Sequence, residues 1–195
     1  MLHFLGMMTR LYFVRHADAY DEEGIQLDAY SLNNFGRIQA LQLAKRLREN
    51  KFDLMYCSKI RRSIETCQIV NEEHDMDVIY DARLNEVGDE TWPQPGIPTN
   101  PQGCKDFEQA QKDIYETFKD IYTNNRGKEI ILFTHGNLIR VLLSKTLNHQ
   151  SDPETFVHFV IANSSLTIID IDDNDFEHII TVSDASHTQL YETRI

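Results

Sequence analysis

The chain has 195 residues, of which 41% are hydrophobic, a size and composition typical of one globular domain with a packed core and unlike those of a disordered chain. Its 31 acidic and 19 basic residues give a formal net charge of −12, which argues against general binding to nucleic acid or to an anionic membrane surface. The three cysteines form no metal-binding spacing, residues 1–9 do not resemble a signal peptide, and no apolar run reaches the ~20 residues that span a bilayer, so we expect a cytoplasmic protein.

The first half of the chain alternates apolar runs with helical patterns. Residues 11–14 are apolar without interruption and predict a strand that is buried on both faces. Residues 32–50 predict an amphipathic helix, whose apolar face we expect at Phe35, Ile38, Leu41, Ala44 and Leu47. The pattern then predicts a strand over 52–57, a helix over 59–71 and a short strand over 77–81.

A proline-rich stretch follows. Four of the five prolines fall within residues 93–101, and because proline removes backbone donors and fixes φ, we expect a loop there, with a lid as its candidate role. We place this lid or insertion at about residues 87–125. Within it, helical spacing returns at Phe107, Ala110, Ile114, Phe118 and Ile121.

The rest of the chain returns to alternating elements. Residues 130–133 predict a strand and residues 137–147 a helix. Three further strands are expected over 155–162, 166–171 and 178–182, the last two joined by a polar turn. Strands that alternate with helices and end on a hairpin predict an α/β fold, a three-layer sandwich with a mostly parallel central sheet flanked by helices, in a single domain of residues 1–195.

Polar side chains follow several of the predicted strands. In open α/β sheets the ligand site lies beyond the carboxyl ends of the strands, so residues at these places are candidates for function. They are Arg15 and His16, Ser58 with Arg61 and Arg62, Glu86, and Thr134 with His135 and Gly136.

Histidines and arginines gathered at one sheet edge would repel one another unless an anion lay among them. One guanidinium group can bind two phosphate oxygens at once and never loses its charge, so arginine suits the binding of a phosphoryl group. Gly136, at a strand-to-helix turn, allows close backbone approach, and the free N–H groups of the helix start add to an anion site. Each residue alone has a simpler explanation as a structural or solvated side chain, but their common placement predicts an anion site with histidine chemistry.

Five separated motifs carry a resemblance to a known family. FVRHADA, SLNNFGRIQALQLAKRL, YCSKIRRSIETC, RLNE and FTHGNLIRVLL occur in this order and resemble the histidine phosphatase superfamily, whose best-known members are the cofactor-dependent phosphoglycerate mutases. The resemblance implies a phosphoglycerate mutase-like fold. It also implies roles for individual residues.

Those implied roles cover both steps of a phosphoryl transfer. Arg15 and Arg62 become the arginines that bind the phosphoryl group, and His16 becomes the nucleophile. His135 becomes the second histidine of the pocket, and Glu86 the proton donor. Arg61 is then the outward neighbour of Arg62.

The function that follows is a metal-independent phosphomonoesterase with a phosphohistidine intermediate on His16, without a cofactor or a metal. The substrate is a phosphorylated small molecule or a phosphoprotein. A phosphoglycerate mutase-type phosphotransferase and a noncatalytic module that binds phosphorylated ligands are the alternatives; the short segment between Glu86 and His135 favours hydrolysis over the mutase. We expect no nucleic acid or membrane partner, and a homodimer could form through an exposed edge strand near the C-terminus.

Overall fold

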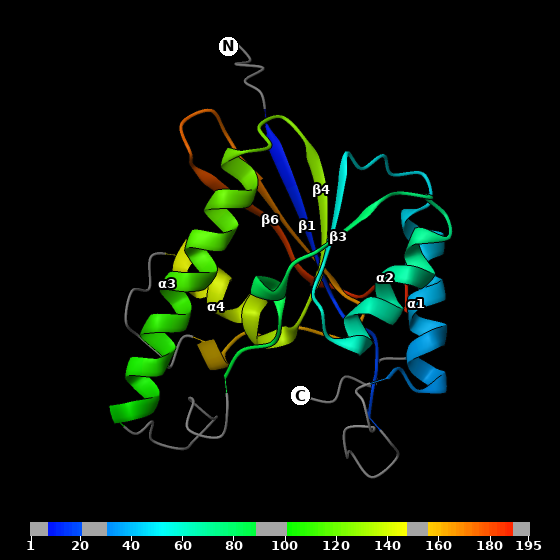
Figure 1. The fold of residues 1–195 in the computed structure, drawn as a ribbon, viewed down its shortest axis with the longest axis horizontal. Coiled ribbons are helices and arrows are strands. Elements are labelled where there is room, and N and C mark those ends of the chain that lie inside the picture. The colour runs from blue at the N-terminus through cyan, green and yellow to red at the C-terminus, as the bar shows by residue number, and fades with distance from the viewer. Residues whose placement is uncertain (1–7, 21–30, 89–100, 148–155, 189–195) are drawn as a thin grey trace.

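The computed structural model describes residues 8–20, 31–88, 101–147 and 156–188, with the backbone alone for residues 101–104 (Figure 1). The fold is built on a six-stranded sheet in the order β3-β2-β4-β1-β5-β6. Its strands are β1 (Thr9–Arg15), β2 (Leu54–Cys57), β3 (Val78–Tyr80), β4 (Glu129–Thr134), β5 (Leu166–Ile171) and β6 (Glu177–Asp184). The first four pair in parallel, whereas β5 runs antiparallel to both β1 and β6. The predicted mostly parallel sheet is therefore confirmed.

Helices cover both faces of the sheet. On one face lie α1 (Asn34–Leu47) and α2 (Arg61–Asn71); on the other lie α3 (Pro101–Thr123) and α4 (Gly136–Thr146), and a 3₁₀ turn, η2 (Ala82–Leu84), follows β3 (Figure 1). These layers confirm the predicted α/β sandwich. None of the helices in the described ranges combines the length and the apolar character that crossing a bilayer requires.

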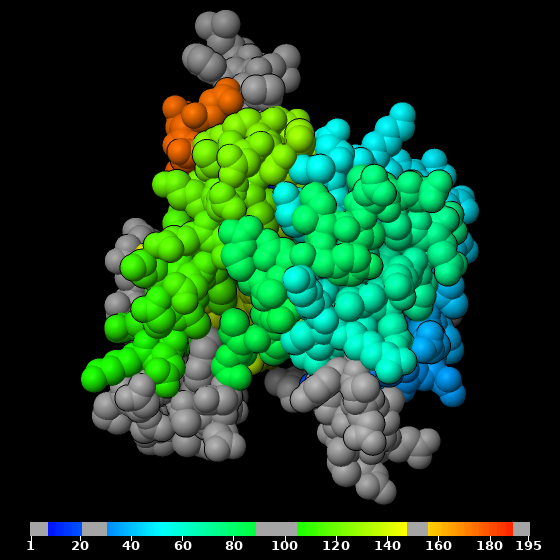
Figure 2. Space-filling view, in the orientation of Figure 1, coloured from blue at the N-terminus to red at the C-terminus, as the bar shows by residue number. Residues whose placement is uncertain are grey.

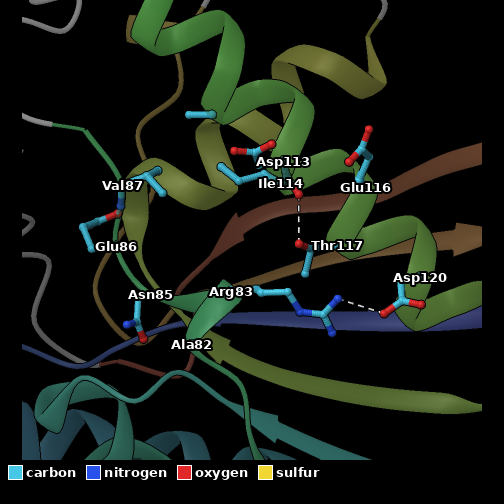
Figure 3. A pocket seen from close by; sticks show the side chains of 11 residues that line it. Ala82, Arg83, Asn85, Glu86, Val87, Asp113, Ile114, Glu116, Thr117 and Asp120 are labelled. Carbon is cyan, nitrogen blue, oxygen red and sulfur yellow. Dashed lines mark hydrogen bonds and ion pairs between the residues drawn. The ribbon is translucent and has the colours of Figure 1, made fainter.

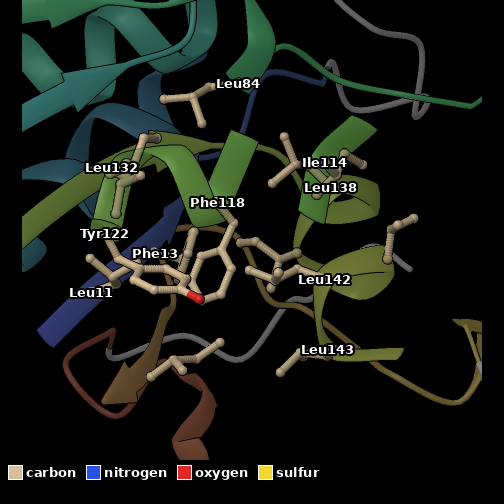
Figure 4. Close-up of a cluster of buried hydrophobic side chains, with 14 of the residues drawn as sticks. Leu11, Phe13, Leu84, Ile114, Phe118, Tyr122, Leu132, Leu138, Leu142 and Leu143 are labelled. Atoms are coloured by element: carbon tan, nitrogen blue, oxygen red, sulfur yellow. The ribbon is translucent and has the colours of Figure 1, made fainter. Parts of the chain in front are cut away.

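The position of β1 between two helical layers explains why its sequence is apolar without interruption. Leu11 and Phe13 point into the cluster beneath α3 and α4, where Phe118 and Leu142 also lie (Figure 4). Tyr12 and Val14, by contrast, join the cluster beneath α1 and α2. Because successive side chains of a strand point to opposite faces, a strand between two helical layers needs apolar residues at every position.

The helix α1 is present, and Ala44 and Leu47 of its predicted apolar face are buried, but the prediction is wrong for Ile38 and Leu41. Ile38 and Leu41 are 52% and 56% exposed. The buried face consists instead of Gly36, Gln39, Ala40, Leu43, Ala44 and Leu47. This rotation has a packing cause: Gly36 lies against the backbone of Asp18, and the Asp18 N–H donates a hydrogen bond to Gln39 Oε1 at 2.9 Å, so small and polar residues of α1 face the segment that follows β1.

We expect Gly36→Ala to destabilise the protein strongly. A Cβ at this position would lie 2.0 Å from the carbonyl oxygen of Asp18, a backbone atom that cannot move without displacing the segment after β1. Overpacking of this kind costs about 1–3 kcal/mol or more, which urea denaturation would measure as a lower free energy of unfolding. Asn34→Ala, an exposed change in the same turn, is the control and should stay within about 0.5 kcal/mol. Equal stabilities of the two variants would contradict the packing.

The predicted strand over residues 155–162 is also wrong. Of its described residues, 156–157 are helical and 158–162 belong to no strand. Phe156 packs edge-on against Phe107 of α3 at a centroid distance of 5.5 Å, and Ile161 is buried in the same cluster. Apolar content alone suggested a strand, but here it anchors a connecting segment over the core. The predicted loop falls mostly on residues 89–100, outside the described ranges, and Pro101 begins α3.

Candidate active site

The register of the central strands brings the predicted site residues to one edge of the sheet. Arg15 and Thr134, the last residues of β1 and β4, are directly paired, and Cys57, the last residue of β2, is paired with Phe133. The next residues therefore leave the sheet together. The rings of His16 and His135 lie 5.2 Å apart between centroids.

His16 is held in one tautomer. Its Nδ1 lies 2.8 Å from the carbonyl oxygen of Ala17, and since a carbonyl can only accept, Nδ1 carries the proton. Its Nε2 then accepts a hydrogen bond from Nε of Arg62 at 2.9 Å. Burial first, and then the charge of Arg15, hold the pKa of His16 well below its ordinary value, so the ring is neutral near pH 7. The result is an imidazole whose lone pair on Nε2 points at a guanidinium.

Arg62 is placed by the first turn of α2. The hydroxyl of Thr66 donates to the Arg62 carbonyl at 2.8 Å and accepts from the Ala17 N–H at 3.0 Å. Thr66 thus ties α2 to the segment after β1. Arg61, the neighbour in sequence, pairs instead with Glu65 at 2.9 Å and is exposed, as expected for an outward residue.

His135 is buried and its ring contacts Ser58. The Ser58 hydroxyl lies 2.7 Å from Nε2 of His135 and 3.2 Å from Oδ1 of Asn85. Assigning the hydroxyl proton to the shorter contact leaves the ring proton on Nδ1, which is buried without a hydrogen-bond partner among the described residues. Burial, with Arg62 and Arg15, lowers the pKa of His135 well below its ordinary value. His135 therefore offers a neutral N–H donor.

Arg15 carries a largely buried positive charge. One of its terminal nitrogens donates to the carbonyl oxygen of Ile161, while its Nε has no partner in the described part of the chain. Burial lowers the pKa of this guanidinium, and the nearby Tyr20 and Glu86 oppose that effect. A Cβ on Gly136 would lie 3.3 Å from Nε of Arg15, so the glycine lets the guanidinium pack against the start of α4.

Glu86 lies at the start of α4. Its Oε1 accepts hydrogen bonds from the backbone N–H groups of Asn137 and Val87, each at 3.2 Å. Burial raises the pKa of this carboxyl, although the charges of Arg15 and Arg62 oppose the shift. Such a carboxyl can hold a proton nearer to neutral pH than an exposed one.

A groove of about 690 Å³ opens beside Glu86, between η2 and α3. Figure 2 shows the hollow at the surface between these segments, and Figure 3 shows the side chains that line it. Asp113 and Glu116 of α3 stand at its edge, and Arg83 reaches across to Asp120 at 2.9 Å (Figure 3). The groove gives the predicted proton donor an open path to solvent.

Several residues that shape this site carry no obvious signal in the sequence. Asn85 Oδ1 accepts a hydrogen bond from the Lys59 N–H at 2.9 Å and lies 3.2 Å from the Ser58 hydroxyl, and so ties the segment before Glu86 to the end of β2. Ser164, at φ 59°, donates its N–H to the carbonyl oxygens of Arg15 and His16. Both act through the backbone of residues far away in sequence, which spacing cannot reveal. No three histidine, cysteine, aspartate or glutamate residues form a metal-ligand group within the described ranges.

We expect the buried histidines to make stability fall in mild acid. In the unfolded chain both titrate near pH 6.5, whereas in the folded protein the pKa values of His16 and His135 lie well below this. Below about pH 6.5 the unfolded state therefore binds more protons, and the free energy of unfolding falls by at most about 1.4 kcal/mol per pH unit for each histidine. The raised pKa of Glu86 has the opposite effect on the free energy of unfolding as the pH falls. The folded state binds a proton at a pH at which the unfolded state has still released it.

Urea denaturation between pH 7 and pH 5 would measure this slope. His16→Asn, which removes one titrating ring, should give a shallower loss of stability than the unchanged protein. Identical slopes would contradict the neutral, buried state of His16.

Comparison with known proteins places the chain in a family. Residues 11–182 match the model of the histidine phosphatase superfamily (branch 1). Phosphoglycerate mutase-like protein 4 of Arabidopsis thaliana is 27% identical over 180 residues, which cover 81% of this chain and 76% of that protein. A Hydrogenobacter thermophilus protein provisionally named phosphoserine phosphatase 2 is 37% identical over 84 residues, so the match spans only 41% of this chain and 41% of that relative's length.

A solved structure shares the fold over nearly the whole chain. The phosphoserine phosphatase of Entamoeba histolytica, in complex with 3-phosphoglyceric acid, has a TM-score of 0.74 and 21% identity, and the match covers 92% of this chain and 98% of that chain. The predicted α/β sandwich is thus the fold of this solved phosphatase.

Proposed function

The chain belongs to branch 1 of the histidine phosphatase superfamily, and from this premise we propose that it is a phosphomonoesterase that forms a phosphohistidine on His16. The observation that carries the proposal is the neutral imidazole of His16, whose unprotonated Nε2 lies 2.9 Å from Nε of Arg62 and beside the buried charge of Arg15. A dianionic phosphoryl group would satisfy both arginines and take the place of Nε2 as the acceptor for Arg62.

In the first step Nε2 of His16 attacks phosphorus opposite the ester oxygen. The N–P bond forms as the P–O ester bond breaks, and the electron pair of that bond stays on the leaving oxygen, which takes the proton of Glu86. Arg15, Arg62 and the Nδ1–H of His135 hold the nonbridging oxygens as charge develops there. The carbonyl of Ala17 continues to accept the Nδ1–H of His16 and so stabilises the charge on the phosphorylated ring.

In the second step water attacks the phosphohistidine. Glu86, now a carboxylate, accepts a proton from the water, the O–P bond forms, and the electron pair of the N–P bond returns to Nε2. The groove beside Glu86 leaves room for the alcohol to depart and for water to enter.

We propose a small phosphorylated molecule as the substrate class. The support is the solved relative named phosphoserine phosphatase, whose structure is a complex with 3-phosphoglyceric acid, and a mutant of the same enzyme in complex with phosphoserine. A phosphoprotein substrate and a mutase reaction are the alternatives that the experiment below separates.

We also propose a domain organisation, a compartment and an oligomeric state for the protein. The chain forms one domain, in which residues 87–125 are an insertion that includes the core helix α3, and it works in the cytoplasm. A homodimer would pair β6, an edge strand of the sheet, with a second copy.

The proposal is tested by following the phosphoryl group. The purified protein should hydrolyse an aryl phosphate in excess EDTA and, after rapid quenching with a ³²P-labelled ester, carry a label that is lost in acid and kept in alkali. Saturable binding without product would identify a noncatalytic module, and transfer of label to a second alcohol instead of water would identify a mutase. Side-by-side rates for small phosphate esters and phosphopeptides would test the substrate class.

A further inference from the structure

The hydroxyl of Ser58 is held between two polar groups at the edge of the site. Its oxygen lies 2.7 Å from Nε2 of His135 and 3.2 Å from Oδ1 of Asn85. The Ser58 N–H donates to the carbonyl oxygen of Phe133 at 2.9 Å, so the backbone of Ser58 is anchored to β4 just before His135. Ser58 and His135 are both buried, so bulk solvent does not compete for the contact between them.

The amide of Asn85 is fixed with its oxygen towards Ser58. Oδ1 accepts the backbone N–H of Lys59 at 2.9 Å, which an amide nitrogen could not do. The backbone before Asn85 is held as well, because the Thr134 hydroxyl donates to the carbonyl oxygen of Leu84 at 2.8 Å. Oδ1 has a second lone pair, which is available to the Ser58 hydroxyl. Asn85 is therefore a fixed hydrogen-bond acceptor.

The Ser58 hydroxyl can serve His135 in two orientations. It has one proton and two lone pairs, and one lone pair accepts the Ile60 N–H at 3.1 Å. With its proton towards His135, it donates to Nε2 of a neutral ring. With its proton turned to Asn85, it has a lone pair left to accept an Nε2–H from a protonated ring. In both cases Nδ1 of His135 carries a proton.

Nδ1 of His135 is the donor left for a ligand, since it is buried without a hydrogen-bond partner among the described residues. The charged and titratable groups around the ring are Arg15 and His16 at the end of β1, Arg62 of α2, and Glu86 near the start of α4. In the free protein, burial and then the charges of Arg62 and Arg15 lower the pKa of His135, so the ring is neutral. A bound dianion would offset both arginines and attract a proton to the ring.

We propose that Ser58 is a positioning residue that, with Asn85 behind it, lets His135 take up a proton when a phosphoryl dianion binds and keeps the Nδ1–H directed at that group. This inference rests on the proposed function, which requires only a donor on Nδ1. On binding, a proton from solution ends on Nε2, and the Ser58 hydroxyl rotates from Nε2 towards Oδ1 of Asn85. The ring then meets the charge that develops on the nonbridging oxygens with a positive charge as well as a hydrogen bond.

Nitrogen NMR of the histidine rings tests this inference directly. In protein with ¹⁵N-labelled histidine at pH 7, His135 should show a protonated Nδ1 and an unprotonated Nε2. Sulfate is the probe, because it is a tetrahedral dianion that does not itself titrate near neutral pH. Saturating sulfate should move Nε2 of His135 into the protonated range and leave Nδ1 protonated. The spectrum of His135→Asn, which lacks this ring, assigns the signals.

Two serine variants separate the hydroxyl from the space that it fills. Ser58→Ala should give a mixture of the two neutral tautomers in the free protein, a smaller protonated fraction with sulfate, and about tenfold or weaker sulfate binding, the effect of losing a hydrogen bond to a charged group. Ser58→Thr keeps the hydroxyl and should keep the spectra of the unchanged protein. Asn85→Ala removes only the second acceptor, so the neutral tautomer should stay while protonation with sulfate is lost.

Ser144→Ala is the matched control. Ser144 is also buried, and its hydroxyl donates to the carbonyl oxygen of Arg140 at 2.8 Å, further along α4. It should leave the histidine spectra and the affinity for sulfate unchanged, and thermal unfolding would show which variants are folded. If Ser58→Thr does not fold, Asn85→Ala decides the inference.

Three results would overturn the inference: a His135 ring that is protonated without sulfate, one that stays neutral with sulfate, or one that responds to sulfate equally in Ser58→Ala. None of them touches the proposed function, which is judged by hydrolysis and by the phosphoenzyme. Loss of the phosphoenzyme with an unchanged response of His135 would instead remove the proposed function and leave an anion site.

Discussion

Replacing His16 with alanine is expected to lower kcat for phosphate ester hydrolysis by about 10⁴-fold or more and to remove the acid-labile phosphoenzyme. The ring supplies the only group in the proposed scheme that forms a covalent bond to phosphorus. Arg15, Arg62 and His135 would still bind the ester, so the Michaelis constant should change far less than kcat. Steady-state rates and rapid-quench labelling would measure the two effects.

His74→Ala provides a matched control for this substitution. His74 is a partly buried histidine whose pKa is also lowered by burial, and its ring packs against Phe52 at a centroid distance of 5.2 Å, at the other end of α2. It should retain turnover and phosphoenzyme. Turnover by His16→Ala at a comparable rate would remove His16 from the role of nucleophile.

The convergence of the site residues could be predicted because it depends on strand ends. Parallel strands all deliver their carboxyl ends to one edge, so Arg15 with His16 and Thr134 with His135 had to meet once β1 and β4 were neighbours. An alternative strand order would have separated them. The apolar runs indicated the strands, and the motifs resembling the family indicated the order.

The features that could not be predicted depend on packing between segments distant in sequence. In α1, apolar residues at Ile38 and Leu41 suggested a buried face, but the close contact of Gly36 with the Asp18 backbone rotates the helix and exposes them. Small residues carry a weaker hydrophobic signal than large ones, although only they permit this approach.

The segment around Ile161 shows the same limit. Its β-branched and aromatic residues are typical of a strand, yet the Ile161 carbonyl accepts a hydrogen bond from Arg15 instead of from a neighbouring strand. The β-propensity of a residue does not indicate which group its backbone carbonyl will form a hydrogen bond with. The support of Arg15 by residues 161–165 therefore appears only in three dimensions.

Glu86→Gln is expected to lower kcat for esters of poor leaving groups by about 10²–10⁴-fold. Glutamine keeps the size of the side chain and can still accept the N–H bonds of Asn137 and Val87, but it cannot give a proton to the departing oxygen. Hydrolysis of glycerol 3-phosphate, whose alkoxide needs that proton, would measure the full loss.

The leaving group supplies the control for this variant. The p-nitrophenolate ion departs without protonation, so the first step with p-nitrophenyl phosphate should lose much less than with glycerol 3-phosphate, as burst-phase kinetics would show. The pH profile has a defined sign as well: the alkyl ester rate should fall as pH rises through the raised pKa of Glu86, because the donor then loses its proton. Equal losses for the two esters, or no change in that alkaline limb in Glu86→Gln, would show that the proton comes from another group and that burial of Glu86 serves the fold alone.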